Sequence, residues 1–306
     1  MHTSLCNKTF DLMPVCSPCH CSPVEPETPV ILSRCFRTKC TLTLFNLLTL
    51  FSSVVPLCRL FSVACSCTRT NLNMLAAQAD RVMELGEWEE RWQENRIGFH
   101  QPHIHKLLEK NVDQLFAGRT GVCCFFPLCG KALDMKWVAD LGHSVVGVEI
   151  SEKAIRQFFE ENKLAYREEP VPAIPGAKVF KSSEKNITLY QCDLYSFSSS
   201  FEGKFGAIWD RGSLVAINPG DREKYASLII SLMAKDCRYL LDTFLYNPEL
   251  FKGPPFLVPN EQVHSLFGES CDIELLQSVD SFTDKHRAWG VDYLTENMHL
   301  LTLKSN

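Results

Sequence analysis

From residue 75 onward, the hydrophobic positions alternate between a pattern typical of amphipathic helices and one typical of buried strands. In residues 85–92, Trp88 and Trp92 are four positions apart and therefore share one face of a predicted helix. Residues 105–116 also place apolar side chains at helical spacing, namely Leu107, Leu108, Val112, Leu115 and Phe116. By the same criterion, three more helices are predicted at 131–141, 152–162 and 222–234.

Short apolar runs without polar alternation predict strands that are buried on both faces. Such runs lie between the predicted helices, at 121–126, 143–150, 187–192, 205–209 and 238–246. Strands that alternate with helices indicate an α/β fold, with a mostly parallel sheet and helices on both faces. Two final extended stretches, 274–282 and 298–303, have no crossover helix between them. We expect these two to pair antiparallel at the edge of the sheet.

The first 74 residues follow neither pattern. They contain nine of the chain's 15 cysteines, and six basic side chains against three acidic ones. Residues 75–306 contain 25 basic and 33 acidic side chains. We therefore predict two regions, a cysteine-rich N-terminal extension at 1–74 and one folded domain at 75–306.

Two interpretations of the extension stay open. Residues 40–58 carry no charge and follow three basic residues, which permits a membrane segment or a signal, and the composition is similar to that of a transit peptide. Asn46 and Pro56 interrupt this run. We favour an unstructured extension, or an upstream start ahead of Met74 or Met83, because chain termini are often disordered. The expected location is the cytoplasm, with a membrane or organelle as the alternative.

We predict no metal site. Residues 16–21 read Cys-Ser-Pro-Cys-His-Cys, which matches the spacing of a haem attachment or half a zinc site. Neighbouring prolines oppose a helix there, and no clean second pair of ligands follows. His100, His103 and His105 lack the i, i+4 spacing of a helical zinc site, so we interpret them as a solvated helix entry. The six cysteines of the domain stand singly in apolar runs, as reduced buried thiols do.

Composition narrows the function classes. The chain has 306 residues, of which 45% are hydrophobic and 22% charged, values near those of soluble globular proteins. Wholly disordered, collagen-like and multi-span membrane proteins are therefore excluded. A net charge of -5 gives no overall attraction to nucleic acid, so we expect no nucleic-acid partner.

The first predicted strand–helix–strand unit has the arrangement of an adenosine site. In open α/β sheets, ligands bind beyond the carboxyl ends of the strands. Gly130, in the loop after the first strand, allows close approach of the backbone, and Glu149 ends the second strand where a carboxylate can accept both ribose hydroxyls. The loop contains one glycine, whereas dinucleotide sites use G-x-G-x-x-G, which favours a nucleoside without phosphates such as S-adenosylmethionine.

Several longer motifs extend this likeness to a known family. They are the segments 125–131 (FFPLCGK), 143–151 (HSVVGVEIS), 208–222 (IWDRGSLVAINPGDR), 253–256 (GPPF) and 286–290 (HRAWG). Together they resemble the thiopurine S-methyltransferase family over about 85–303. The resemblance implies a class I methyltransferase fold, which is Rossmann-like with a seven-stranded sheet. It also implies methyl transfer from S-adenosyl-L-methionine to the sulfur of aromatic and heterocyclic thiols, including thiopurines in xenobiotic metabolism, with S-adenosyl-L-homocysteine as product.

The resemblance also implies a set of cofactor-binding residues. Leu128 and Gly130 would line the methionine side, Glu149 would hold the ribose, and Asp193 and Leu194 would lie beside the adenine. The family pattern has Ser where this chain has Asp193, so the adenine contact is expected to differ. A covering N-terminal segment would bring three aromatic residues to the ligands, namely Trp88, Trp92 and Phe99.

On the acceptor side, the resemblance implies substrate contacts from Phe99, Arg211 and Lys285, with Arg211 near the cofactor as well. Lys285 stands where the family pattern has Arg, so the charge is kept but the two-pronged donor is lost. A cation at Arg211, helped by Lys285, would favour the substrate thiolate, as neighbouring cations do for cysteine. No dedicated base is then required, although Asp210 is a candidate.

The alternatives are a non-catalytic protein that binds S-adenosylmethionine and, less favoured, a nicotinamide oxidoreductase. The single-glycine loop disfavours the oxidoreductase. Arg211 and Phe99 disfavour the non-catalytic protein, because both belong to the expected reaction site. The resemblance further implies a monomer with a small-molecule thiol as partner, and no membrane association of the catalytic domain.

Overall fold

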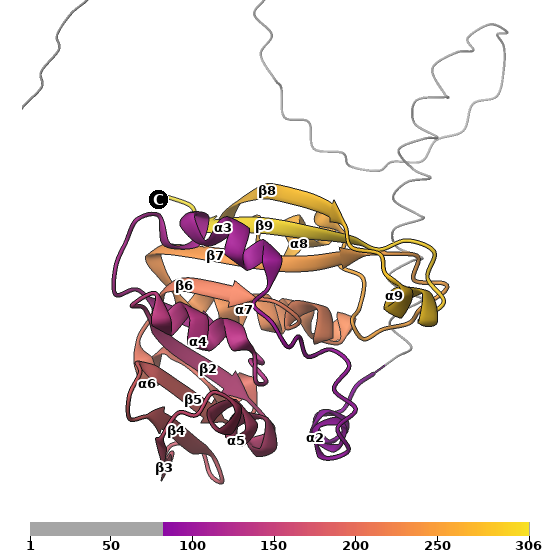
Figure 1. Cartoon of the computed structure of the whole chain (residues 1–306). Coiled ribbons are helices and arrows are strands. Elements are labelled where there is room, and N and C mark those ends of the chain that lie inside the picture. Colours follow the sequence, from indigo (N-terminus) through magenta and orange to yellow (C-terminus); the bar gives the residue numbers. More distant parts are fainter. Residues whose placement is uncertain (1–81, 306) are drawn as a thin grey trace, which may run out of the picture. The chain divides into compact units, whose positions relative to one another are not determined.

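A mixed sheet forms the centre of the computed structural model, which describes residues 82–305; the predicted extension at 1–74 lies outside them. The strand order is β3-β4-β5-β2-β1-β6-β7-β9-β8 (Figure 1). The five central strands are parallel. They are β5 (Ile187–Gln191), β2 (Ser144–Glu149), β1 (Cys123–Phe126), β6 (Phe205–Asp210) and β7 (Met233–Leu245).

The C-terminal edge is antiparallel, as expected. Strand β9 (Thr295–Leu303) pairs antiparallel with both β7 and β8 (Cys271–Asp280). All seven expected strands form, although β7 begins at Met233, five positions before the predicted start. The strand order therefore reverses at β1, which is where ligands bind in open α/β sheets.

Two further strands, which the hydrophobic pattern did not predict, extend the sheet to nine strands. They are β3 (Tyr166–Pro170) and β4 (Lys178–Ser182), both antiparallel and added beside β5. The sequence of β3 is YREEP, and its side chains are exposed or half-buried. An edge strand of this kind has no apolar face, so hydrophobic periodicity cannot reveal it.

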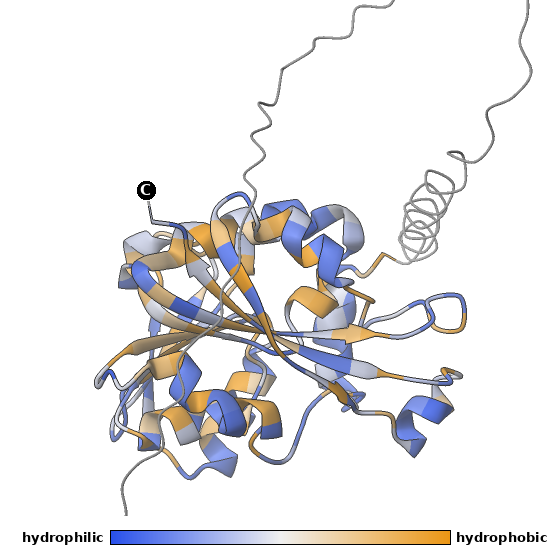
Figure 2. Ribbon diagram, turned by 90° about the horizontal axis from the view of Figure 1, so that it is seen from above, coloured by the Kyte–Doolittle hydropathy of each residue, from blue (hydrophilic) through white to orange (hydrophobic). Residues whose placement is uncertain are grey.

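Helices cover both faces of the sheet, each over its own core. On one face lie α3 (Lys106–Phe116), α4 (Leu133–Asp140) and α5 (Glu152–Glu161), and on the other lie α7 (Arg222–Leu232) and α8 (Asn260–Phe267) (Figure 1). In Figure 2, the helices on either side of the sheet carry both hydrophobic and hydrophilic stretches. This pattern is typical of helices that bury one face against a core.

Short elements complete the fold. Helices α2 (Leu85–Gln93) and α9 (Asp284–Ala288) lie near the ends of the strands to which the arrowheads point in Figure 1. The others are α6 (Ser199–Glu202) and three 3₁₀ turns, Leu194–Ser196, Leu214–Ala216 and Pro219–Asp221. Among residues 82–305, no helix combines the length and apolar character needed to cross a bilayer.

Candidate active site

A cavity of about 1120 Å³ opens at the carboxyl ends of the parallel strands. Segments from α2, α9 and the loops after β1, β2, β5 and β6 line it. With the exception of Asp210, every site residue expected from the sequence contributes to its wall. These residues are Trp88, Trp92, Phe99, Leu128, Gly130, Glu149, Asp193, Leu194, Arg211 and Lys285.

The loop after β1 is tightly wound. Leu128 has a φ of 44° and Gly130 a φ of 51°, and the backbone N–H of Cys129 donates to the carbonyl of Val148 at 2.9 Å. A Cβ atom on Gly130 would lie 3.0 Å from the Trp92 ring. Gly130 therefore meets two demands, a left-handed backbone and close contact with α2.

Glu149 is held by this loop at the end of β2. Its Oε2 accepts the backbone N–H of Gly130 at 2.9 Å, and its Oε1 accepts that of Ser151 at 2.8 Å. Burial raises the pKa of the Glu149 carboxyl, while these two hydrogen bonds act in the opposite direction. Each carboxylate oxygen keeps a lone pair, so the group can still accept two hydroxyls.

The thiol of Cys129 is buried and is not suited to act as a nucleophile. A Cβ on Gly147 of β2 would lie 2.7 Å from its sulfur, so the absence of a side chain at Gly147 makes room for it. The side chain is buried, and burial raises the pKa of the thiol well above its usual range. A thiol that stays protonated is a poor nucleophile.

Beyond β5, Asp193 has a local structural task as well as a place in the cavity wall. Its Oδ1 accepts the backbone N–H of Tyr195 at 3.0 Å and caps the turn Leu194–Ser196. Leu194 is buried beside it. The two residues thus present one polar and one apolar group at this end of the cavity.

Three aromatic residues close the cavity from the N-terminal side. The Phe99 ring stands edge to face with Trp88 and Trp92, with centroid distances of 5.8 and 5.5 Å. Such pairs are favourable beyond the apolar area that they bury. The cluster fixes the backbone of Phe99 near the loop after β6.

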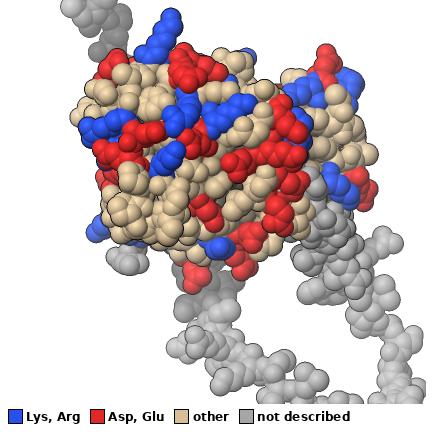
Figure 3. Space-filling view, turned by 90° about the horizontal axis from the view of Figure 1, so that it is seen from below, with Lys and Arg blue, Asp and Glu red and all other residues tan. Residues whose placement is uncertain are grey.

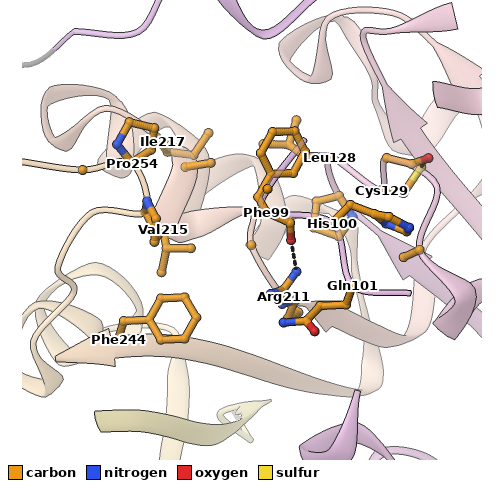
Figure 4. A pocket seen from close by; sticks show the side chains of 18 of the residues that line it. Phe99, His100, Gln101, Leu128, Cys129, Arg211, Val215, Ile217, Phe244 and Pro254 are labelled. Atoms are coloured by element: carbon orange, nitrogen blue, oxygen red, sulfur yellow. Dashed lines mark hydrogen bonds between the residues drawn. The ribbon is translucent and has the colours of Figure 1, made fainter. Parts of the chain in front are cut away.

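Two cations meet this same stretch of backbone. Arg211 donates from Nη1 to the Phe99 carbonyl at 2.9 Å (Figure 4), and Lys285 donates to the carbonyl of Gly98. Within residues 82–305, neither of them forms an ion pair, and Arg211 Nε is buried without a hydrogen-bond partner. Burial, and then the charge of Arg211, lower the pKa of Lys285. This arrangement provides positive charge for an anion from elsewhere.

Apolar side chains form the walls beside the cations. In Figure 4, Phe99 and Leu128 lie on one side of the cavity. The opposite side is formed by Val215, Ile217, Phe244 and Pro254. The sequence does not mark these four as site residues, because each is an ordinary apolar residue and they come from three segments of the chain.

The described residues are similar in sequence to known proteins. Residues 83–304 match the family model described as thiopurine S-methyltransferase. The chain belongs to this family. It is 64% identical over 231 residues to a Danio rerio protein named as a probable thiopurine S-methyltransferase, covering 76% of this chain and all of the relative. It is 54% identical to the thiopurine S-methyltransferase of Canis lupus familiaris, covering 74% and 93%.

Membership of the thiopurine S-methyltransferase family confirms the resemblance, and with it an enzyme that uses S-adenosylmethionine. Among solved structures, an S-adenosylmethionine-dependent methyltransferase from Anabaena variabilis overlaps 73% of this chain and 96% of its own at a TM-score of 0.49 and 14% identity. The mixed sheet with its reversal at β1 agrees with the expected class I arrangement.

The cavity residues fit this cofactor. Gly130 leaves space where a Cβ would meet Trp92, and the buried Glu149 carboxylate lines the cavity with lone pairs that hydroxyl groups can use. S-adenosylmethionine, when bound, supplies a methyl group that is already electrophilic. The cofactor side therefore needs binding groups rather than reactive ones.

Asp210, the candidate base, does not reach the cavity. It is fully buried, and its Oδ2 accepts the hydroxyls of Tyr225 and Tyr239 at 2.5 and 2.7 Å, while Oδ1 accepts the backbone N–H of Leu214. Burial raises the pKa of the Asp210 carboxyl. A catalytic role at Asp210 therefore stays a prediction, and in this structure its oxygens are occupied by two tyrosine hydroxyls and one backbone N–H.

His105 also differs from the expectation of a solvated helix entry. Its side chain is 8% exposed and its Nε2 lies 3.2 Å from Glu296 Oε1. Asp242 lies beside them, and one ligand-type atom from each of the three residues lies within 4.8 Å of the others. The sequence could not indicate this cluster, because α3, β7 and β9 are distant along the chain.

Proposed function

We propose that this chain transfers the methyl group of S-adenosylmethionine to the sulfur of aromatic and heterocyclic thiols, thiopurines among them. One observation carries the proposal. Arg211 and Lys285 present positive charge and form no ion pair among residues 82–305, and they lie beside apolar walls and next to the Gly130–Glu149 loop. An aromatic thiolate offers the matching charge and shape.

The chain's residues have separate tasks in this reaction. Arg211 and Lys285 favour the thiolate form, because a nearby cation lowers the pKa of a thiol. Phe99 and Leu128 face the apolar residues across the cavity and hold a flat ring between them. Holding the two sulfurs and the methyl group in line removes much of the entropic barrier to the transfer.

On the cofactor side, Glu149 accepts the ribose hydroxyls, and the backbone at Leu128 and Gly130 follows the methionine portion. Asp193 and Leu194 contact the adenine in this proposal. Trp88 and Trp92 cover the bound molecule and exclude water, with Trp92 already packed on Gly130.

The partners proposed are a small thiol and no nucleic acid. Basic and acidic side chains alternate on the face shown in Figure 3, which supports the absence of a nucleic-acid site there. We propose a monomer in the cytoplasm that acts in xenobiotic metabolism. The alternative location, at a membrane or in an organelle, depends on residues 1–74, which lie outside the described residues.

The test uses the full chain with methyl-labelled S-adenosylmethionine and a panel of aryl, heterocyclic and alkyl thiols. We expect a labelled thioether and one S-adenosylhomocysteine per methyl transferred. Tight cofactor binding without any product would instead support the non-catalytic alternative. Hydride transfer to or from a nicotinamide cofactor would support the oxidoreductase.

A further inference from the structure

Methylation of a thiol releases a proton, and the two cavity cations cannot take it. An Arg guanidinium and a charged Lys ammonium are donors only, with no acceptor atom. Asp210 is enclosed by its two tyrosine hydroxyls and does not line the cavity. For thiols of ordinary acidity, a separate acceptor is needed, because the neutral form dominates at pH 7.

The cluster of His105, Asp242 and Glu296 lies at the wall of the same cavity. His105 and Glu296 are lining residues, and Asp242 is fully buried behind them. Glu296 receives hydrogen bonds on both oxygens, since His105 Nε2 is 3.2 Å from Oε1 and Ser281 Oγ donates to Oε2 at 2.7 Å. The cluster thus combines one imidazole with two carboxyl groups.

The two carboxyl groups cannot both be ionised. A carboxylate oxygen of Asp242 lies within 4.8 Å of one of Glu296, and both Asp242 oxygens are buried without a hydrogen-bond partner among the described residues. Burial, and then the facing charge of Glu296, raise the pKa of Asp242 well above its usual range. Although burial acts against them, hydrogen bonds from His105 and Ser281 lower the pKa of Glu296. Asp242 is therefore the member of the pair that stays protonated more readily.

His105 is fixed in place from three sides. Its backbone N–H donates to Asp134 Oδ1 at 2.8 Å, and Asp134 Oδ2 accepts the Trp209 indole N–H at 3.2 Å. The His105 ring lies 5.6 Å from that of Trp209. Its Nε2 meets Glu296, whereas its Nδ1 is buried and has no hydrogen-bond partner in the described part of the chain. A carboxylate that orients one ring nitrogen leaves the other free to accept a proton.

We propose that His105, oriented by Glu296 and Asp242, is the general base that takes the proton of the substrate thiol. This inference rests on the proposed function. The S–H bond breaks and its electron pair stays on sulfur, while the proton passes to His105 Nδ1 after substrate binding has opened a path to this buried atom. The sulfur then takes the methyl group, and the pair of the broken bond stays on the departing sulfur. The Glu296 carboxylate stabilises the imidazolium until its proton returns to solvent.

Other charged groups act on this cluster from the surrounding elements. Arg211 after β6 opposes the rise in the pKa of Asp242, and His286 of α9 interacts with the charge of Glu296. Asp210 at the end of β6 also raises the pKa of Asp242, after burial and the charge of Glu296. Asp134 of α4 accepts the backbone N–H of His105, and Lys285 of α9 lines the same cavity. Because Arg211 and Lys285 stabilise the thiolate directly, acidic thiols need no base, and only weakly acidic thiols depend on His105.

The test compares the full chain with its H105Q and E296Q variants on three thiols of decreasing acidity, 4-nitrothiophenol, thiophenol and 2-phenylethanethiol. For H105Q we expect kcat on 2-phenylethanethiol to fall about 10²-fold, with a smaller loss on thiophenol and the smallest on 4-nitrothiophenol. The acidic limb of kcat for 2-phenylethanethiol should vanish in H105Q. For E296Q, kcat on 2-phenylethanethiol should fall as well, but by less than in H105Q, because the ring loses the carboxylate that orients it.

The exposed residues His264 and Glu274 provide matched controls, H264Q and E274Q, which should follow the wild type. Cofactor affinity and thermal unfolding of each variant show whether the fold is intact. Equal losses on all three thiols, or no loss, would overturn the inference. So would activity on 2-phenylethanethiol that EDTA removes and Zn²⁺ restores, since His105 would then be a metal ligand. A wild-type chain that methylates none of the three would instead overturn the proposed function.

Discussion

The proposed cofactor side and the proposed acceptor side of the cavity are assembled in different ways. On the cofactor side, Gly130 and Glu149 are 19 positions apart, belong to one strand–helix–strand unit and bond to each other. On the acceptor side, the hydrogen bond from Arg211 to Phe99 spans 112 positions and that from Lys285 to Gly98 spans 187. One side is a product of local sequence, whereas the other depends on the whole fold.

The two sides also differ in how their polar groups are satisfied. Both oxygens of Glu149 already accept backbone N–H groups. Opposite them, Arg211 Nε and His105 Nδ1 are buried without hydrogen-bond partners among residues 82–305. Unpaired buried groups are costly, so a ligand that supplied a partner to Arg211 Nε or His105 Nδ1 would remove part of that cost. The proposed cofactor side has one such group as well, the Tyr195 hydroxyl.

The largest effect is expected from Arg211→Ala. Removing the cation that faces the developing and bound thiolate should lower kcat/KM for thiols by about 10² to 10³, the usual cost of losing one such electrostatic donor. Arg211→Lys should recover part of this loss, because it keeps the charge but not the fork. Steady-state kinetics with 4-nitrothiophenol measure both variants. Unchanged turnover in Arg211→Ala would show that Arg211 does not stabilise the substrate thiolate, and the contrast between the two sides would then not hold.

Glu149→Gln should weaken cofactor binding on the proposed cofactor side of the cavity. The amide cannot accept at both ends, so one of the N–H groups of Gly130 and Ser151 loses its acceptor and a ribose hydroxyl loses its carboxylate. Affinity for S-adenosylmethionine should weaken by about 2 kcal/mol, or about 30-fold in Kd. Calorimetry gives this value, with the exposed Glu160→Gln on α5 as control. A higher KM for the thiol with unchanged cofactor affinity would contradict the assignment.

These differences also explain what could be predicted from the sequence. The parallel strands, the Gly130 loop and Glu149 follow from local periodicity and spacing within about 30 residues. The edge strand β3 was missed because Arg167, Glu168 and Glu169 give it no apolar face. Arg211 and Lys285 came from family resemblance alone, since a single basic residue has no spacing that marks it.

The environment of a strand end could not be foreseen either. Glu149 and Asp210 both end parallel strands, but Glu149 opens on the cavity while Asp210 is covered by Tyr225 and Tyr239. Which of the two acids faces a ligand depends on the helix packed behind it. Likewise, Asp242 and Glu296 face each other only because β7 and β9 are neighbours in the sheet.

Asp210→Asn should separate stability from turnover. The amide keeps the shape but replaces one acceptor of the Tyr225 and Tyr239 hydroxyls or of the Leu214 N–H with a donor, which should lower the free energy of unfolding by about 1–3 kcal/mol. Urea unfolding measures this loss. The folded fraction should keep a kcat close to that of the wild type. A stable Asp210→Asn variant without turnover would restore Asp210 as the base.

The smallest effect is expected from Lys285→Arg, and it appears in the pH dependence. Burial and the charge of Arg211 lower the pKa of Lys285 below its usual 10.5, so its positive charge is lost as the pH rises through the lowered value. An arginine keeps its charge there. We use 4-nitrothiophenol because it is ionised over the whole alkaline pH range. The kcat/KM of the wild type should therefore decline as the pH rises, while that of Lys285→Arg should decline only at higher pH. The exposed Lys252→Arg is the control. Identical alkaline limbs would place the thiolate beyond the reach of Lys285 and leave Arg211 as its main cation.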